Sequence, residues 1–251
     1  MKRLTKKLWI LVVILTLCGT TTSYAQTEEV KPYIELSQLP KLLEIMPPPP
    51  AFDSPEFAYD LVRYGWAKQQ QKDSARVALA IADAEWNDHT KIYLQWKDAF
   101  GLEINEVNTP EIWNLLETSI ATIDPMRKEP KAHYSRLRPF EYFNDSMPSN
   151  EEAELSGEGS FPSGHALRGW CISLILAQIA PQRATEIYSR GWDYCNSRVI
   201  VSAHWQSDVD VSRTAGSIGY CALQGCPEFI AQMKKAQAEY AEKTRQSILK
   251  K

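Results

Sequence analysis

The chain has 251 residues, of which 44% are hydrophobic and 24% charged, and its formal net charge is −3. These values are typical of a globular protein long enough for one large core or two small domains. Lysine and arginine do not cluster along the sequence, which argues against a nucleic-acid partner. The longest apolar run covers only the ten residues 8–17, about half of what a membrane-spanning helix needs, so a multi-span membrane enzyme is excluded.

The first 25 residues have the three parts of a secretory signal peptide. A basic head (residues 2–7) precedes the apolar run 8–17, and the small residues at 23–25 fit a cleavage site. We expect cleavage after Ala25 and a periplasmic or secreted mature protein. Cleavage removes four basic residues and no acidic residue, which changes the formal charge from −3 to −7. A mildly acidic protein must bind any phosphate group in a local pocket.

An oxidising compartment allows the four cysteines of the mature chain to pair. Cys221 and Cys226 flank a turn-like Gln-Gly pair, and the sequence leaves open whether they form a disulfide. Cys171 and Cys195 lie within apolar helical patterns, which suit buried thiols as well as a bond. No CxxC motif occurs, so the cysteines suggest neither zinc binding nor redox catalysis.

Residues 26–56 are predicted to be an irregular segment, because they contain the stiff proline run 47–50. From residue 57 the pattern becomes helical. Asp73 is placed to cap a helix that we expect to continue until Gly101 stops it.

The remaining chain repeats a helical spacing of apolar residues. Thr109 is predicted to cap a helix that begins at Pro110. The apolar periods cover residues 112–123, 167–180, 184–195, 211–218 and 228–251. The last of these is charged and amphipathic, which favours a solvated surface helix. Strand-like alternation is scarce, so the simplest interpretation is one all-α domain, residues 57–251, folded as a helical bundle.

One of four histidines lies where a helix is predicted to begin. His165 ends the string Pro162-Ser163-Gly164-His165. Proline and glycine allow a tight turn here, and the new helix presents unpaired N–H groups and the positive end of its dipole, which together attract an anion. The Ser163 hydroxyl suits a helix cap as well as a ligand contact, so this string alone leaves both open.

A second histidine is spaced from a carboxylate by one helical turn. In Ser197-Arg198-x5-His204-x3-Asp208, the last two side chains share a face if a helix covers them. A carboxylate that bonds one imidazole nitrogen fixes the tautomer and leaves the other nitrogen free as a nucleophile. Taken alone, the pair also fits an ordinary surface ion pair.

The third motif is Lys131-x6-Arg138-Pro139. Seven residues are two helical turns, about 10.5 Å along an axis, and long side chains converge over that distance. Pro139 is predicted to end the element beside Arg138. Taken alone, this motif also fits a solvated basic face.

Together the three motifs supply what phosphoryl transfer without a metal ion requires. The cations and helix N–H groups take the charge of the phosphoryl oxygens. One histidine attacks phosphorus, and the other protonates the leaving oxygen.

The complete set of motifs resembles the signature of the type 2 phosphatidic-acid phosphatase and vanadium haloperoxidase superfamily. The sequence is most similar to the bacterial class A non-specific acid phosphatases, which are exported helical proteins. The similarity covers residues 45–222 and rests on Gly159-Ser160-Phe161 before the proline and on the segment 197–210. Phe161 and Ala166 stand where tyrosine and threonine are common, and we expect them to tune the pocket.

The resemblance implies a role for each motif residue. His204 would be the nucleophile that forms a phosphohistidine, Asp208 would orient it, and His165 would serve as acid and base. The phosphate group would be held by Lys131, Arg138, Ser163, Gly164 and Arg198.

It also implies activity without a metal ion or other cofactor. The substrates would be many phosphate monoesters, with phosphoryl transfer to alcohols in some members. Inorganic phosphate and vanadate would inhibit. Class members are often homo-oligomers.

Three other functions use similar residues. A vanadium-dependent haloperoxidase shares the site, but the chain is short for one. A lipid or polyprenyl-pyrophosphate phosphatase is expected to have spanning helices. A phosphate-binding protein without activity needs neither His204 nor Asp208. Of the remaining histidines, His133 fits the pocket rim or the surface, and His89 is expected to be solvated.

Overall fold

The computed structural model describes residues 30–249, and every regular element in that range is helical. The expected all-α fold is confirmed, while the predicted signal peptide lies outside the described residues. Among the helices of residues 30–249, each is too short or too polar to cross a lipid bilayer. In chain order the elements are η1 (Leu36–Gln38), α1 (Leu42–Ile45), α2 (Phe57–Gln70), α3 (Ser74–Ala82), α4 (His89–Leu94), α5 (Lys97–Phe100), α6 (Pro110–Ile123), η2 (Asp124–Arg127), α7 (Lys128–Tyr134), α8 (Pro139–Phe143), α9 (Glu152–Leu155), α10 (Gly164–Ile179), η3 (Pro181–Arg183), α11 (Ala184–Ile200), α12 (Gln206–Gln224) and α13 (Pro227–Leu249).

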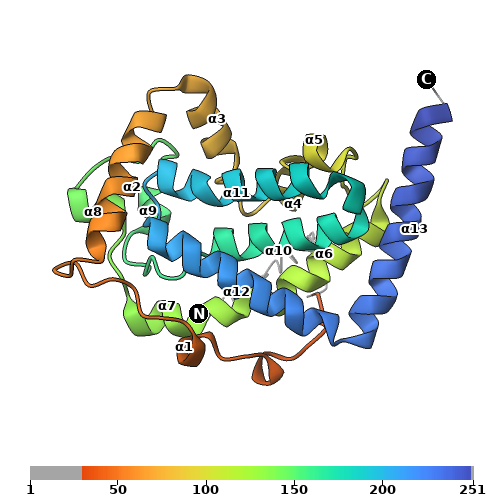
Figure 1. Ribbon diagram of the computed structural model, residues 1–251, viewed down its shortest axis with the longest axis horizontal. Coiled ribbons are helices and arrows are strands. Elements are labelled where there is room, and N and C mark those ends of the chain that lie inside the picture. Colours follow the sequence, from red (N-terminus) through yellow and green to blue (C-terminus); the bar gives the residue numbers. More distant parts are fainter. Residues whose placement is uncertain (1–29, 250–251) are drawn as a thin grey trace, which may run out of the picture.

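The centre of the bundle is α10, which lies between α11 and α12 (Figure 1). Twelve of its sixteen residues are buried, so it is apolar on nearly all sides rather than on one stripe. In Figure 1, α2, α8 and α9 gather at one end of these three helices, and α13 crosses the other end. The N-terminus of α10, which carries His165, therefore lies at the end nearest α8 and α9.

The close crossing of α10 and α12 depends on a glycine. A Cβ atom at Gly216 would lie 2.6 Å from the backbone oxygen of Leu167, a distance that no real side chain tolerates. The missing side chain lets the two backbones touch. This contact fixes how the start of α12 lies relative to the start of α10.

The prediction of a single helix between Asp73 and Gly101 is wrong. Asp73 does cap α3, by accepting bonds from Ala75 N and Arg76 N, but the chain forms three short helices, α3 to α5, before Gly101 ends the last one in a left-handed conformation.

The interruption has an electrostatic cause. Asp83 is fully buried and accepts hydrogen bonds from Ser197 (2.6 Å) and Arg190, which draws the chain toward α11. The carboxylate of Glu85 then accepts the next three backbone N–H groups, at 2.9–3.2 Å. Asp88 caps the new helix through Lys91 N. These side-chain bonds replace the helical ones.

Helix α6 begins at Pro110 as predicted, but Thr109 does not cap it through its side chain. The cap is instead Glu239 of α13, whose carboxylate accepts from Glu111 N (3.3 Å) and Ile112 N (2.9 Å). Helix α13 buries one face, formed by Phe229, Met233, Ala236 and Tyr240, against the core. The expectation of a solvated terminal helix therefore holds only for its outer face.

All four cysteines of the described residues are free. The Cys221–Cys226 bridge that the sequence left open is not formed. Cys221 is exposed on α12, while the Cys226 thiol contacts the carboxylate of Glu228 at 3.0 Å. Cys171 and Cys195 are buried as thiols, and burial raises the pKa of Cys195 to about 12.

Candidate active site

His165 sits on the first turn of α10, next to its N-cap. Ser163 is that N-cap, and its hydroxyl accepts a hydrogen bond from Ala166 N at 3.3 Å. His165 is 8% exposed, and its Nε2 bonds the carbonyl of Ala84 at 3.0 Å. That carbonyl is available because the chain turns out of helix after α3. The contact commits Nε2 as a donor, so Nδ1 is the nitrogen left for a ligand.

His204 lies in the turn between α11 and α12. Ser202 adopts a left-handed conformation (φ 63°), and the backbone N–H groups of Ala203 and His204 bond the carbonyl of Arg198. The residue is 3% exposed, and its Nδ1 lies 2.7 Å from the carbonyl oxygen of Ser160. Only a protonated Nδ1 makes that bond, so Nε2 carries the lone pair. Nε2 faces the guanidinium of Arg138 at 3.2 Å.

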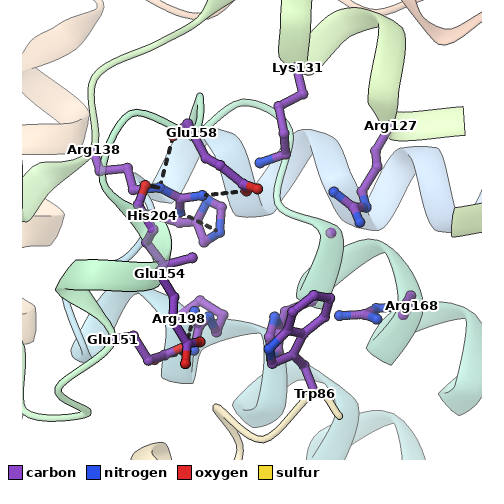
Figure 2. A pocket seen from close by; sticks show the side chains of 13 residues that line it. Trp86, Arg127, Lys131, Arg138, Glu151, Glu154, Glu158, Arg168, Arg198 and His204 are labelled. Atoms are coloured by element: carbon purple, nitrogen blue, oxygen red, sulfur yellow. Dashed lines mark hydrogen bonds and ion pairs between the residues drawn. The ribbon is translucent and has the colours of Figure 1, made fainter. Parts of the chain in front are cut away.

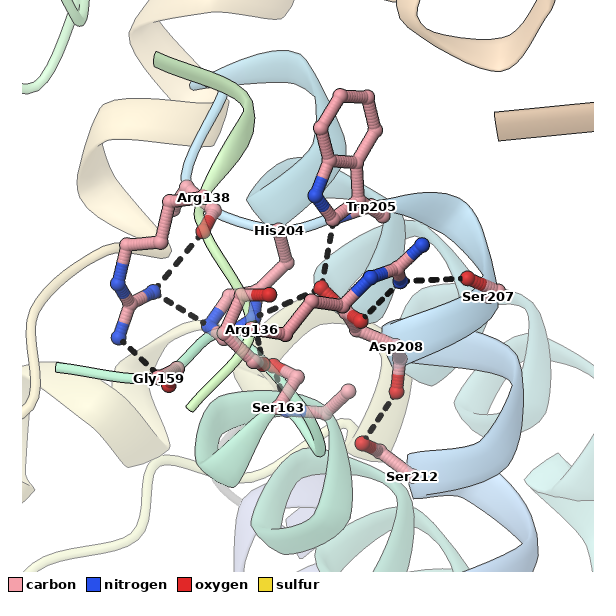
Figure 3. A network of polar contacts seen from close by, with 12 residues as sticks. Arg136, Arg138, Gly159, Ser163, His204, Trp205, Ser207, Asp208 and Ser212 are labelled. Carbon is pink, nitrogen blue, oxygen red and sulfur yellow. Dashed lines mark hydrogen bonds and ion pairs between the residues drawn. The ribbon is translucent and has the colours of Figure 1, made fainter. Parts of the chain in front are cut away.

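Asp208 lies behind His204 but does not hydrogen-bond to it. Its Oδ2 is 3.7 Å from Nδ1 of His204, close enough for an electrostatic contact only. The same oxygen accepts from Trp205 N at 2.8 Å, and Oδ1 accepts from Arg136 at 2.6 Å (Figure 3). The direct bond expected from the sequence is made by the Ser160 carbonyl instead.

The three cations that the sequence singled out converge on one pocket together with both histidines (Figure 2). Lys131 comes from α7, which the left-handed Ser135 ends, so it shares no helix with Arg138. Pro139 does not end an element but begins α8, with Arg138 as the extended residue before it. Lys131 Nζ donates to Gly159 O at 2.5 Å. The cations meet through a turn, not along a helical face.

The third cation, Arg198, is paired with a carboxylate. Arg198 is 1% exposed, and its two terminal nitrogens bond the two oxygens of Glu151, each at 3.0 Å. Glu151 immediately precedes α9, in the segment between α8 and α10. Neither its spacing nor its surroundings in the sequence signal this pairing.

Burial determines the charge of these groups. Burial lowers the pKa of Lys131 to about 7, and the charges of Arg138 and Arg127 add smaller effects in the same direction. It also lowers the pKa values of His165 and His204 well below the ordinary histidine value, with nearby guanidinium groups adding to the effect. Burial and the neighbouring cations therefore favour the neutral form of both imidazoles, and a bound anion opposes this effect.

The pocket contains cations that the sequence analysis missed. Arg127 and Arg168 lie across the pocket from His204 in Figure 2. Both contact Asp124, Arg127 through two bonds of 2.9 and 3.0 Å and Arg168 at 3.5 Å. The position of Arg168, three residues after His165, is the one sequence signal that could have found it.

Most of the remaining lining is acidic. It consists of Glu151, Glu154 and Glu158, with Trp86, Leu155 and Gly164. Trp86 is 43% exposed, and the Arg168 guanidinium lies 5.8 Å from its ring centre.

The other two histidines lie outside this pocket. His133 is exposed and packs edge-on against Tyr134, which favours the surface over the rim. The expectation that His89 is solvated is wrong, because its Nδ1 bonds Glu117 at 2.7 Å in a partly buried position. Within residues 30–249, no group of three or more His, Cys, Asp or Glu side chains is arranged to hold a metal ion.

Comparisons with known proteins identify the family of the chain. Residues 115–228 match the family model of the PAP2 superfamily. The chain is 36% identical to a non-specific acid phosphatase of Salmonella typhimurium strain LT2 over 225 residues, covering 88% of each chain. It is 38% identical to one from Salmonella typhi, covering 79% of each, and 34% identical to one from Providencia stuartii, covering 83% of this chain and 84% of the relative.

Proposed function

The chain belongs to the PAP2 superfamily and, within it, to the class A non-specific acid phosphatases, and from this premise we propose that it hydrolyses many phosphate monoesters through a phosphohistidine on His204. The observation that carries the proposal is one pocket lined by two buried imidazoles and three motif cations. Binding alone does not call for a neutral, sequestered imidazole beside an arginine.

His204 is the proposed nucleophile. Its Nδ1 proton is held by the Ser160 carbonyl, which leaves the lone pair on Nε2, where it faces the Arg138 guanidinium in the pocket wall. Attack of Nε2 on phosphorus forms a P–N bond while the bond from phosphorus to the leaving oxygen breaks. Asp208, 3.7 Å from the ring, stabilises the positive charge that the imidazole then carries.

His165 is the proposed acid and base. A bound phosphate dianion raises the proton affinity of the nearby ring, which lets His165 protonate the departing oxygen. In the second half of the reaction water attacks phosphorus, His165 takes its proton, and the P–N bond breaks. Phosphate leaves, and His204 regains its lone pair.

The phosphoryl group is held by Lys131, Arg138 and Arg198, with Ser163 and the Gly164 backbone at the start of α10. These groups meet the three phosphoryl oxygens with positive charge and N–H donors, the part that metal ions play in other phosphatases. Inorganic phosphate and vanadate are expected to compete for the same groups. Because these contacts fall on the phosphate, the leaving group varies freely, and alcohols can replace water as acceptors.

We also propose that the protein is exported. The basic head, the apolar run and the small residues before residue 26 support cleavage after Ala25 and a periplasmic location. N-terminal sequencing of protein recovered from a periplasmic extract tests this proposal. A chain that still begins at Met1 contradicts it.

The mechanism is tested by trapping the intermediate. Protein incubated with ³²P-labelled phosphate ester is quenched in alkali, which preserves phosphohistidine, and the label is mapped by digestion. Label on His204 is expected, with unchanged turnover in EDTA. Label elsewhere, or loss of turnover in EDTA, overturns the proposal. A bromide–peroxide assay on vanadate-treated protein tests the haloperoxidase alternative.

A further inference from the structure

A buried arginine lies behind the proposed nucleophile and joins two carboxylates. Arg136 donates to Asp208 Oδ1 at 2.6 Å and to Asp60 Oδ2 at 2.9 Å. Its side chain is 3% exposed, and both carboxylates are fully buried. Figure 3 shows the guanidinium of Arg136 beside Asp208, on the side away from Arg138. No motif that predicted the site includes Arg136 or Asp60.

Asp60 also holds the start of α12. It accepts hydrogen bonds from the backbone N–H of Ser207 at 2.8 Å and from the Ser207 hydroxyl at 2.6 Å. Arg136 donates to that hydroxyl at 2.8 Å. Asp60 belongs to α2, outside the residues 115–228 that match the superfamily. An N-terminal helix thus fixes the turn from which Asp208 projects.

The charges of this cluster do not cancel. Two carboxylates and one guanidinium carry a formal net charge of −1, and the oxygen of this cluster that faces His204, Oδ2 of Asp208, lies 3.7 Å from Nδ1 of the ring. A net charge that is buried in this way is costly, and a cation placed beside it is stabilised. The imidazole of His204 becomes such a cation when it is phosphorylated. Both Asp208 oxygens are fixed, one by Arg136 and one by Trp205 N, so the carboxylate cannot turn away.

We propose that Asp60 and Arg136 are positioning residues for the phosphatase reaction: they hold Asp208 in place and leave the cluster one net negative charge that stabilises phosphorylated His204. This inference rests on the proposed phosphohistidine mechanism. It assigns the two residues to the chemical step and not to phosphate binding, because neither of them lines the pocket.

The test separates those two steps. Asp60→Asn keeps the shape of the side chain and makes the cluster neutral. We expect kcat on p-nitrophenyl phosphate to fall about tenfold, with less ³²P trapped on His204, while the Ki of inorganic phosphate stays within about twofold. Asp60→Glu, which restores the charge, is expected to recover part of kcat.

The matched control is Asp210→Asn. Like Asp60, Asp210 pairs with a buried arginine, Arg213, but it lies on α12 beyond Asp208 and bonds neither Arg136 nor Asp208. Thermal unfolding of each variant reports its stability. A purely structural role for Asp60 lowers the melting temperature without changing kcat per folded molecule.

Three results overturn the proposal. They are a kcat for Asp60→Asn no lower than for Asp210→Asn, a parallel loss of kcat and phosphate affinity, and an unchanged level of trapped phosphoenzyme. If Asp60→Asn does not fold, Ser207→Ala takes its place, with a kcat about threefold lower expected at unchanged Ki and an unchanged kcat as the contrary result. Absence of label from the unaltered protein refutes the phosphohistidine itself, independently of Asp60.

Discussion

The carboxylate of Glu151 holds the guanidinium of Arg198 by two hydrogen bonds of 3.0 Å at the wall of the pocket. The carboxylate presents two oxygens to the arginine in the way that a phosphate group would. Arg198 is 1% exposed, so it cannot serve both partners fully at once. A substrate that uses Arg198 must therefore displace Glu151 or share the guanidinium with it.

Removing the charge of Glu151 should strengthen phosphate binding. In Glu151→Gln we expect the Ki of inorganic phosphate to fall about fivefold, equal to about 1 kcal/mol. Competitive inhibition of p-nitrophenyl phosphate hydrolysis measures this. Glu154→Gln is the control, because Glu154 lines the same pocket but is not bonded to Arg198. An equal change in both variants would show a general charge effect and not a displaced contact.

Removing His165 should harm poor leaving groups most. In His165→Ala we expect kcat/KM for an alkyl phosphate to fall by about 10²–10⁴, because the departing alkoxide then lacks its proton donor. The loss for p-nitrophenyl phosphate should be much smaller, since nitrophenolate leaves without help. His133→Ala, at an exposed site, is the control. Equal losses on both esters contradict the acid role.

Phosphate affinity should fall above neutral pH, through Lys131. Its pKa is lowered to about 7, so the ammonium is charged below that pH and becomes neutral above it. An anion that needs the charged form must then bind together with a proton, and its Ki rises with pH. Lys131→Arg stays charged across the range and should give a flatter dependence between pH 6 and 9. Identical slopes in the two proteins would assign the effect to another group.

Two glycines should respond in opposite directions to alanine. At Gly216 the new Cβ would meet the Leu167 backbone, and we expect a loss of about 1–3 kcal/mol in the free energy of unfolding. At Gly65 in α2 nothing lies within 4 Å, and the higher helix propensity of alanine should stabilise by about 0.5–1 kcal/mol. Urea denaturation measures both. A tolerated Gly216→Ala would mean that the α10–α12 crossing can widen.

The sequence predicted the all-α class and the convergence of the three motifs, because both predictions rest on short local patterns. Apolar spacing marks a helix locally, and Ser163 and Pro110 mark helix starts without help from the rest of the fold. The break after Ala82 escaped prediction because its cause is distant: Asp83 pairs with residues of α11, more than a hundred positions away.

The partners of the motif residues were harder to predict than the residues themselves. Asp208 follows His204 by only four residues, yet Arg136 and Trp205 occupy its oxygens and the Ser160 carbonyl accepts the hydrogen bond from the imidazole. A backbone carbonyl has no sequence signature. Glu151 is one of several acids in a polar segment, and only the packing of that segment selects it.

The hydrogen bonds between Glu239 and the first turn of α6 have a consequence for the order of synthesis and folding. The backbone N–H groups of Glu111 and Ile112 donate to a carboxylate that lies 128 and 127 residues later in the chain, in α13. The cap of α6 can therefore form only after synthesis has passed Glu239. On the proposed export route, a chain whose synthesis has not yet passed Glu239 meets the translocase without this cap.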